Sequence, residues 1–343
     1  MVKYPELHYD GNTSLPALHT LKCLCAFLVV MIHVNSPFRF ELLPLTQTAV
    51  PIFYLISGYF LVGPDSLINR SRITKTLKKI AGIAIVANLV YLLFLAALNF
   101  HRCGDFYNIL PYFKPSNLLS LLVFGGTVSG HLWYLNAYMF ALLLTGLIIK
   151  LKWQKIIPFL IFAGLAVAIL LGQYSRLTSL PDIGYALNRN GFTIAFPCVM
   201  TGACIRIYES RLRNFKYWIA ACIAIVIATY AETYFLSATN GDTITGVLAI
   251  TTIPAAACIF MMFLTTPRLH IPVLSKIGKD YSAHIYIYHI MVMTILDATL
   301  CRIIGIESAL LVFVLTIAAI WSARIALRLS VRLRTVLRHR AAS

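Results

Sequence analysis

The sequence predicts an all-α membrane protein with about ten transmembrane helices and both termini in the cytoplasm. Of its 343 residues, 59% are apolar and only 12% are charged, and the mean hydropathy is +0.81. Soluble domains are about 45–50% apolar, even counting glycine, and about 25% charged. The composition therefore excludes a water-soluble enzyme, a disordered chain and a nucleic-acid-binding domain, despite a formal net charge of +17.

Long apolar segments are the second observation behind this fold class. A spanning helix needs roughly 20 mostly apolar residues. Ten segments have this character: 20–38, 47–63, 80–99, 131–149, 156–173, 191–207, 217–236, 244–265, 281–300 and 307–327. The stretch 117–126 is too short to span and is expected to be interfacial or re-entrant. No long soluble insert interrupts the series, so residues 1–343 are expected to form a single membrane-embedded domain.

The distribution of basic residues is the third observation, and it gives the orientation. With residues 1–19 placed inside, the segments on the inner side hold 23 of the 29 lysines and arginines. Loops rich in Lys and Arg stay in the cytoplasm. The positive charge is thus a topology signal and a contact with anionic lipids. Residues 328–343 are expected to form a basic, amphipathic cytoplasmic tail. The outer segments hold Arg39, Arg102, Lys114, Arg176, Arg189 and Arg302.

The start of the chain does not have the pattern of a cleavable signal peptide. Polar-leaning residues precede the first apolar segment, and no A-x-A-like site follows it. That segment is expected to remain as the first helix.

The first helix carries Lys22 and His33, which are on the same face because 11 residues are close to three helical turns. The two residues are about 16 Å apart along the axis. Lys22 would lie at the cytoplasmic surface and His33 near mid-membrane. Each has a structural alternative: a snorkelling anchor for Lys22, and a buried histidine bonded to a carbonyl for His33. Together they suit a long anionic ligand.

The second and fourth helices carry further candidates. In PIFYLISGYFL (51–61), Ser57 and Gly58 permit either close helix packing or room for a ligand. In HLWYLNAY (131–138), His131, Trp133 and Tyr134 are either part of an interfacial aromatic belt or the lining of an outer mouth.

The ninth helix reads YSAHIYIYHIMV (281–292). His289 lies roughly 12 Å into it, close to the level expected for His33. An ionisable group at this depth is a functional candidate, including as a proton relay. At the inner end of the sixth helix, Arg206 is either a topology anchor or a phosphate contact.

No metal site is predicted. The eight cysteines lack metal-ligand spacing, and no nucleotide, zinc or hydrolase motif is present. Cys103 and Cys301 both fall on the outer side, where a disulfide between them is one alternative.

Four segments, LKCLCAFLVVMIHV (21–34), PIFYLISGYFL (51–61), HLWYLNAYM (131–139) and YIYH (286–289), resemble landmarks of the bacterial acyltransferase-3 family of integral membrane acyltransferases in order and spacing. The likeness extends over essentially the whole chain. It is greatest to short members such as the enterobacterial common antigen O-acetyltransferase. The family's first helix usually carries Arg, ten residues and then His. Here Lys22 replaces the arginine, which keeps the charge but loses the bidentate fork.

The resemblance implies transfer of an acyl group, acetyl by default, from acyl-CoA to a hydroxyl of a surface polysaccharide or lipid-linked glycan. Lys22 and Arg206 would hold the CoA phosphates. His33 would be the base or acyl carrier, and His289 would orient or relay. The residues Ser57, His131, Trp133, Tyr134 and Tyr286 would line the channel or contact the carbohydrate acceptor.

Two other functions stay open. Mid-membrane histidines also suit a proton-coupled transporter of a glycan intermediate or small solute, although no repeat symmetry is visible. The Lys22 substitution favours a non-catalytic sensor or assembly subunit. The expected location is the bacterial inner membrane. The partners expected are acyl-CoA, the glycan or glycolipid acceptor and the bilayer, with no nucleic acid, and a homo-oligomer is one alternative.

Overall fold

The computed structural model describes residues 15–34, 39–104, 111, 114–115, 128–180, 189–213, 216–240, 248–298 and 308–341. Among these residues the structure has helices and one isolated bridge, between Val62 and Ile68, but no strand. The larger helices are α1 (Pro16–His33), α3 (Ala49–Leu61), α4 (Arg70–Cys103), α6 (Trp133–Lys150), α7 (Ile157–Leu170), α10 (Phe196–Ile207), α12 (Trp218–Asn240), α13 (Thr252–Thr265), α15 (Ser282–Ala298) and α17 (Ala309–Ala341).

Shorter elements connect these helices. They are α2 (Arg39–Thr46), α8 (Ser175–Thr178), α11 (Glu209–Arg213), α14 (Pro272–Asp280), the 3-10 turns η2 (Gly130–Leu132), η3 (Gln154–Ile156) and η5 (Pro267–Leu269), and the π-helical turn η4 (Gly191–Ala195).

Each of the ten predicted segments overlaps one of the larger helices, so the all-α class is confirmed. Within the described residues, five helices are long and apolar enough to cross a membrane: Pro16–His33, Arg70–Cys103, Gly130–Lys150, Trp218–Thr239 and Ala309–Ser330. The helices α3, α7 and α13 are shorter than a full span. The segment 117–126, Cys301 and the first 14 residues lie outside the described part, so the expectations placed on them remain untested.

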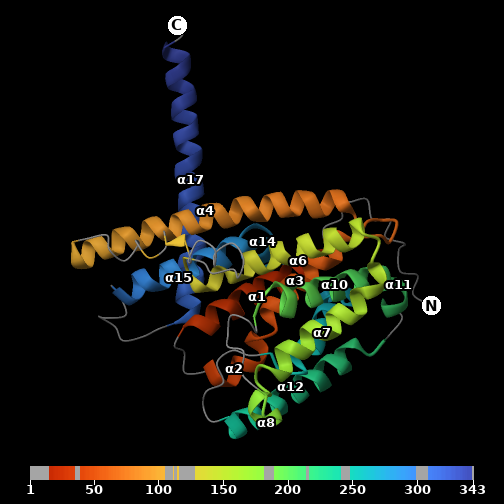
Figure 1. Cartoon of the computed structure of the whole chain (residues 1–343). Coiled ribbons are helices and arrows are strands. Elements are labelled where there is room, and N and C mark those ends of the chain that lie inside the picture. The colour runs from red at the N-terminus through yellow and green to blue at the C-terminus, as the bar shows by residue number, and fades with distance from the viewer. Residues whose placement is uncertain are drawn as a thin grey trace.

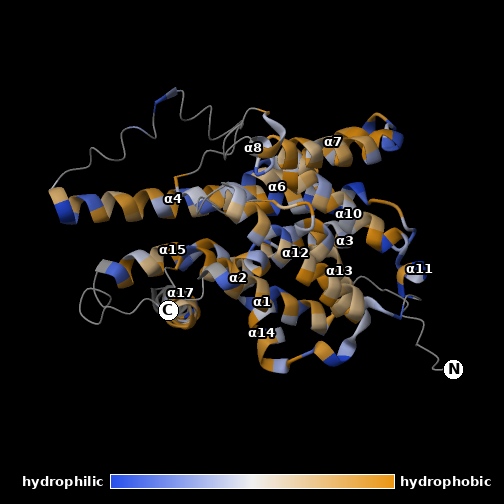
Figure 2. Cartoon of the chain, turned by 90° about the horizontal axis from the view of Figure 1, so that it is seen from below, coloured by the Kyte–Doolittle hydropathy of each residue, from blue (hydrophilic) through white to orange (hydrophobic). Residues whose placement is uncertain are grey.

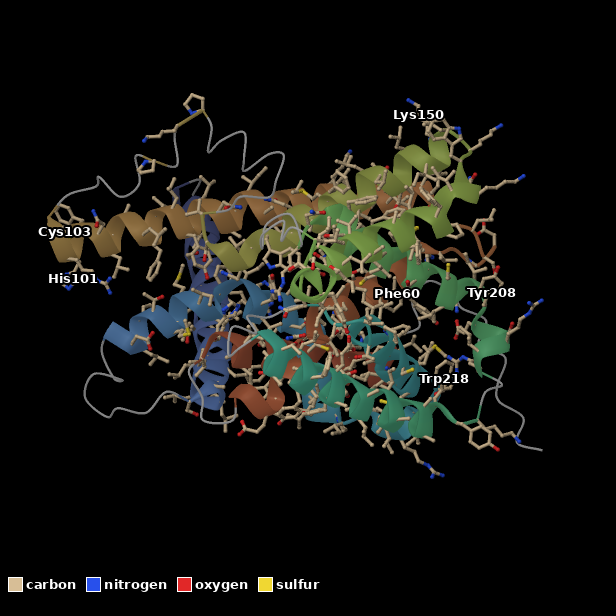
Figure 3. The ribbon with its side chains drawn as sticks, turned by 60° about the horizontal axis from the view of Figure 1, so that its bottom comes forward. Phe60, His101, Cys103, Lys150, Tyr208 and Trp218 are labelled. Atoms are coloured by element: carbon tan, nitrogen blue, oxygen red, sulfur yellow. The ribbon has the colours of Figure 1, made fainter. Side chains whose placement is uncertain are left out.

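The bundle has two distinct ends (Figure 3). Phe60, Lys150 and Tyr208 lie at one end, here called the basic end, and His101 and Cys103 lie at the opposite end of α4. The helix ends marked by Phe60, Lys150 and Tyr208, which lead into three of the connections that the sequence places inside, therefore lie at the same end. Large apolar side chains such as Leu93 on α4 and Phe162 on α7 are exposed, and Figure 2 shows α7 as mostly hydrophobic. Such surfaces suit contact with lipid.

Local sequence explains where several helices begin and end. Pro16 opens α1, where its missing N–H costs nothing. Asn69 caps α4 by accepting a hydrogen bond from the backbone N–H of Arg72 at 3.1 Å. Gly104 ends α4 with a φ of 74°, a conformation that glycine adopts readily. The basic first turns of α4 explain why it begins ten residues before the predicted segment 80–99.

Glycines bring two helix pairs into close contact. A Cβ on Gly58 of α3 would lie 1.8 Å from the carbonyl oxygen of Val199 in α10, and one on Gly202 of α10 would lie 2.0 Å from that of Leu55. A Cβ on Gly278 of α14 would lie 1.9 Å from the oxygen of His19 in α1. Of the two alternatives for Gly58, the contact with Val199 supports helix packing.

The last helix, α17, differs in direction from the rest. In Figure 1 it runs across the direction of α4, and in Figure 2 it is seen end-on. It packs on α1 through Phe313, whose ring meets that of Phe27 with centroids 5.5 Å apart. The helix continues through the basic residues expected to form the tail and ends at Ala341.

Candidate functional site

Three histidines from separate elements pack together inside the bundle. His33 ends α1, His131 lies in η2 just before α6, and His289 lies in α15. The ring centroids of His33 and His289 are 5.1 Å apart, those of His131 and His289 are 5.2 Å apart, and those of His33 and His131 are 6.2 Å apart. Within the described ranges, no group of three or more His, Cys, Asp or Glu is arranged to hold a metal ion.

His131 is fixed through both ring nitrogens. Its Nε2 lies 2.9 Å from the carbonyl oxygen of Ile287 in α15, and its Nδ1 lies 2.9 Å from the hydroxyl of Ser129. Because a carbonyl only accepts, Nε2 carries the proton and Nδ1 accepts from Ser129. The hydroxyl of Tyr91 in α4 also donates to the Ile287 oxygen, at 2.7 Å. His131 therefore joins α6 to α15 at the level of Tyr91.

His289 has the opposite tautomer. Its Nδ1 lies 3.0 Å from the carbonyl oxygen of Ile285 and 2.9 Å from that of Tyr286, so Nδ1 donates and Nε2 carries the lone pair in the neutral ring. The side chain is 0% exposed. Among the described residues, Nε2 has no hydrogen-bond partner. His289 thus holds an unprotonated basic nitrogen in a buried position beside His33.

A cavity of about 380 Å³, here called the main cavity, adjoins these rings. It is within the range of small-ligand sites, about 300–1,000 Å³. Four residues predicted for the site line it together: His33, His131, Trp133 and Tyr286. The hydroxyl of Tyr286 also donates to the backbone oxygen of His131. Other lining residues are Val29, Ile32, Val50, Ser129, Gly130, Arg189 and Ile290.

The other two candidates, Tyr134 and Ser57, do not line this cavity but are linked to Tyr286. The ring of Tyr134 stacks on Tyr54 with centroids 4.5 Å apart and packs on Tyr286 at 5.0 Å. The hydroxyl of Ser57 donates to the oxygen of Phe53 at 2.8 Å and interacts with the hydroxyl of Tyr134. Tyr134 therefore packs directly on Tyr286, and Ser57 acts on Tyr134.

Lys22 lies on the same helix as His33, nearer the start of α1. It is partly buried, and Lys79 of α4 is close enough to interact with it electrostatically. Lys279 of α14 in turn acts on His19, one turn before Lys22. Asp280 also acts on His19 with the opposite sign. Three lysines against this one carboxylate leave a net positive charge at the start of α1, which would attract an anion.

Arg206 is engaged in a polar network with its neighbours. Its guanidinium forms an ion pair with Glu209 and donates to the hydroxyl of Tyr59 at 3.2 Å. Glu209 also accepts from Arg213 at 2.7 Å and from Tyr59 at 2.7 Å. Burial alone would raise the pKa of Glu209, but these hydrogen bonds and charges lower it below its usual 4.5. The carboxylate therefore stays charged and holds Arg206.

The sequence interpretation missed Tyr91, Gln47 and the role of Arg189. Arg189 had counted only as one of six outer charges, yet it lines the main cavity. It also lines an adjoining cavity of about 50 Å³, here called the side cavity, together with Gln47. A basic residue on the side where such residues are scarce was the available signal. Nothing in the sequence around Tyr91 pointed to His131.

Comparison with known families gives one match of nearly full length. The family described as "Acyltransferase domain", acyltransferase-3, matches residues 15–325.

Comparison with curated proteins gives more distant similarities. One "Amino-acid racemase" of Enterococcus faecalis is 27% identical over 326 residues, covering 86% of this chain and 43% of that protein. Another of the same name and organism is 31% identical over 137 residues, covering 37% of this chain and 17% of that protein. The chain thus spans less than half the length of the curated relatives it matches. No solved structure matches significantly.

Proposed function

This chain belongs to the acyltransferase-3 family, and we propose that it transfers an acyl group, acetyl by default, from acyl-CoA to a hydroxyl of a surface polysaccharide or lipid-linked glycan. The proposed location is the bacterial inner membrane. The relatives' name, amino-acid racemase, belongs to proteins more than twice as long as the matched part. We propose no racemase activity for this chain.

One observation carries the proposal: His33 lines the main cavity and packs 5.1 Å from His289, whose buried Nε2 is unprotonated. A neutral imidazole in a water-poor site is suited to take a proton from a hydroxyl. The side chain of His289 is 0% exposed, so bulk water does not reach its Nε2.

The acyl transfer would proceed on these residues as follows. The acceptor oxygen attacks the thioester carbon, a C–O bond forms and the C–S bond breaks. His33 takes the hydroxyl proton, and the CoA thiolate leaves and receives a proton in return. His289, beside His33, passes or holds this proton through Nε2. The alternative of an acyl-His33 intermediate uses the same atoms in two steps.

The donor would bind along α1. Eleven residues separate Lys22 from His33, about 16 Å of helix, which suits a ligand with anionic phosphates at one end and a thioester at the other. Lys22, with Lys79 near it, would hold the phosphates. Arg206 would have to break its ion pair with Glu209 before it could bind a CoA phosphate. Its proposed role in donor binding is therefore secondary to that of Lys22.

The acceptor would enter the main cavity. Trp133 and Tyr286 offer aromatic faces of the kind on which sugar rings pack. Ser129 and the backbone oxygen of Ile287 hold the ring of His131 at the same cavity. Tyr134 and Ser57 would keep Tyr286 in place.

The test needs no assumption about the acceptor. The gene is deleted in its host, and masses of envelope glycans and glycolipids are compared after complementation with wild type or His33→Ala. We expect one species to lose an acyl mass on deletion and to regain it only with wild type. No change in any envelope component would contradict the proposal. In that case acyl-CoA binding would be measured, because a proton-coupled transporter should lack it.

A further inference from the structure

Beside the main cavity lies the side cavity, and its polar lining differs from that of the histidine region. Its lining residues include Thr46, Gln47, Trp133 and Arg189, and it shares Ile32, Val50, Trp133 and Arg189 with the main cavity. The two cavities are therefore adjacent, and these four residues, Arg189 and Trp133 among them, border both.

Gln47 brings a hydrogen-bond donor to this cavity. It lies between α2 and α3, where its backbone N–H donates to the oxygen of Leu43 at 3.1 Å. Its side-chain Nε2 is buried and has no partner among the described residues. A buried amide without a partner costs about 1–3 kcal/mol, so a ligand oxygen accepting from it would remove this cost.

Arg189 brings a positive charge, and the chain around it is well fixed. The side chain of the next residue, Asn190, accepts hydrogen bonds from the backbone N–H of Phe192 at 2.8 Å and of Thr193 at 3.1 Å. The hydroxyl of Thr193 in turn accepts from the backbone N–H of Asn190 at 3.1 Å. This capping box sets the start of η4. A Cβ on Gly191 would lie 2.5 Å from the side chain of Phe140 in α6. The backbone beside Arg189 is thus clamped against α6.

The ligand class follows from these groups. Among the described lining residues of the two cavities, none is Asp or Glu. A guanidinium and an amide N–H, set among apolar side chains, match the oxygens of a carboxylate or phosphate. We propose that Arg189 and Gln47 form an oxyanion-binding subsite, so that the acceptor carries an anionic group next to the hydroxyl that is acylated. The identification of the bound ligand as the acceptor rests on the proposed function, whereas anion binding at the subsite can be tested independently of it.

The probes are three simple sugars: glucose, glucuronate and glucose 6-phosphate. Binding of each to the purified full-length protein in detergent is measured by calorimetry and by the shift in melting temperature, at constant ionic strength. We expect at least one anionic sugar to bind more tightly than glucose. The two anionic arms distinguish a carboxylate from a phosphate.

Variants connect the binding to the subsite. Arg189→Gln should weaken binding of the preferred anionic sugar about tenfold or more, and Gln47→Leu by a smaller factor. Arg189→Lys keeps the charge without the fork, so it should give an intermediate affinity even if the glutamine variant folds poorly. Arg102→Gln, at an exposed arginine near the far end of α4, is the matched control and should bind as wild type does.

Two results would overturn the subsite: no anionic sugar binds better than glucose, or the Arg189 variants bind the anionic sugar as wild type does. Failure of the acyltransferase itself has a different signature. A protein that binds the anionic sugar through Arg189 but changes no envelope species would keep the subsite and lose the proposed reaction. A protein that acetylates a neutral species equally well with Arg189→Gln would keep the reaction and lose the subsite.

Discussion

His33 and His289 face each other across two helices, with ring centroids 5.1 Å apart and an interplanar angle of 42°. One ring belongs to the end of α1 and the other to the middle of α15. Nδ1 of His289 is held by its own helix, so only Nε2 is available for proton exchange. In His289, Nδ1 therefore fixes the orientation of the ring, and Nε2 is the nitrogen that can take part in proton transfer.

The first prediction uses that separation. Asparagine at position 289 can place an amide N–H near the site of Nδ1 but has nothing at the site of Nε2. We expect His289→Asn to fold and to accumulate normally while acyl transfer falls about 10²-fold or more, the usual contribution of general acid–base catalysis. The measurement is transfer of labelled acetyl from acetyl-CoA in membrane vesicles. His101→Asn, exposed near the end of α4, is the control. A wild-type rate for His289→Asn would show that Nε2 has no chemical role.

The second prediction concerns His131, whose Nε2 donates to Ile287. Glutamine can place an amide N–H close to Nε2, whereas alanine removes the donor and leaves a cavity. We expect His131→Gln to retain most of the stability and His131→Ala to lose about 2–4 kcal/mol of unfolding free energy. Denaturant titration in mixed micelles measures the difference. Equal stability of the two variants would mean that the bond to Ile287 contributes nothing.

The helical fold could be read from the sequence because its signal is local. An apolar run forces the backbone to satisfy its own hydrogen bonds in lipid, and only helices or closed barrels do so. The ends and directions of the helices were harder to predict from the sequence. The helix α4 begins at Arg70 because Asn69 caps it and its basic residues form helix well, although they are too polar to count as membrane-spanning. The crossing direction of α17 depends on packing such as the contact of Phe27 with Phe313, which no local pattern encodes.

Part of the candidate site could also be predicted from the sequence, because some of its residues carry a local signal. Ionisable residues within apolar segments are rare and costly, so His33 and His289 stood out, and helix geometry placed them at a similar depth. Partners that lie in other helices or connections did not stand out. Tyr91 looks like an ordinary aromatic residue of α4. Gln47 lies in the connection between α2 and α3, and Arg189 precedes η4. Gln47 and Arg189 come together with Trp133 of α6 only in the folded bundle, where all three line the side cavity.

The third prediction tests the close packing of α3 on α10. A Cβ at position 58 would lie 1.8 Å from the oxygen of Val199, which is backbone and cannot rotate away. We expect Gly58→Ala to destabilise the protein by about 3 kcal/mol or more. Gly82→Ala in α4 is the matched control, since a Cβ there meets nothing within 4 Å. It should be neutral or gain about 0.5–1 kcal/mol from helix propensity. Thermal unfolding in detergent measures both, and similar melting temperatures for the two variants would contradict the packing.

The fourth prediction addresses Lys22, which lies at the start of α1 with Lys79 nearby. If Lys22 binds a CoA phosphate before and during reaction, its loss removes binding that ground and transition states share. Such a loss raises KM and leaves kcat almost unchanged. We therefore expect Lys22→Ala to raise KM for acetyl-CoA about tenfold and Lys22→Arg to lower it, because the guanidinium can bind phosphate through two N–H groups.

Steady-state rates with acetyl-CoA measure these effects, and dephospho-CoA thioester provides a donor with one phosphate fewer. Lys276→Ala, at an exposed lysine of α14, controls for the general loss of positive charge and should leave KM unchanged. If Lys22→Ala lowered the melting temperature but not the affinity for acetyl-CoA, Lys22 would be an anchor at the membrane surface. In that case the positive charge around α1 would contact anionic lipid head groups, and the donor would have to reach His33 by another route.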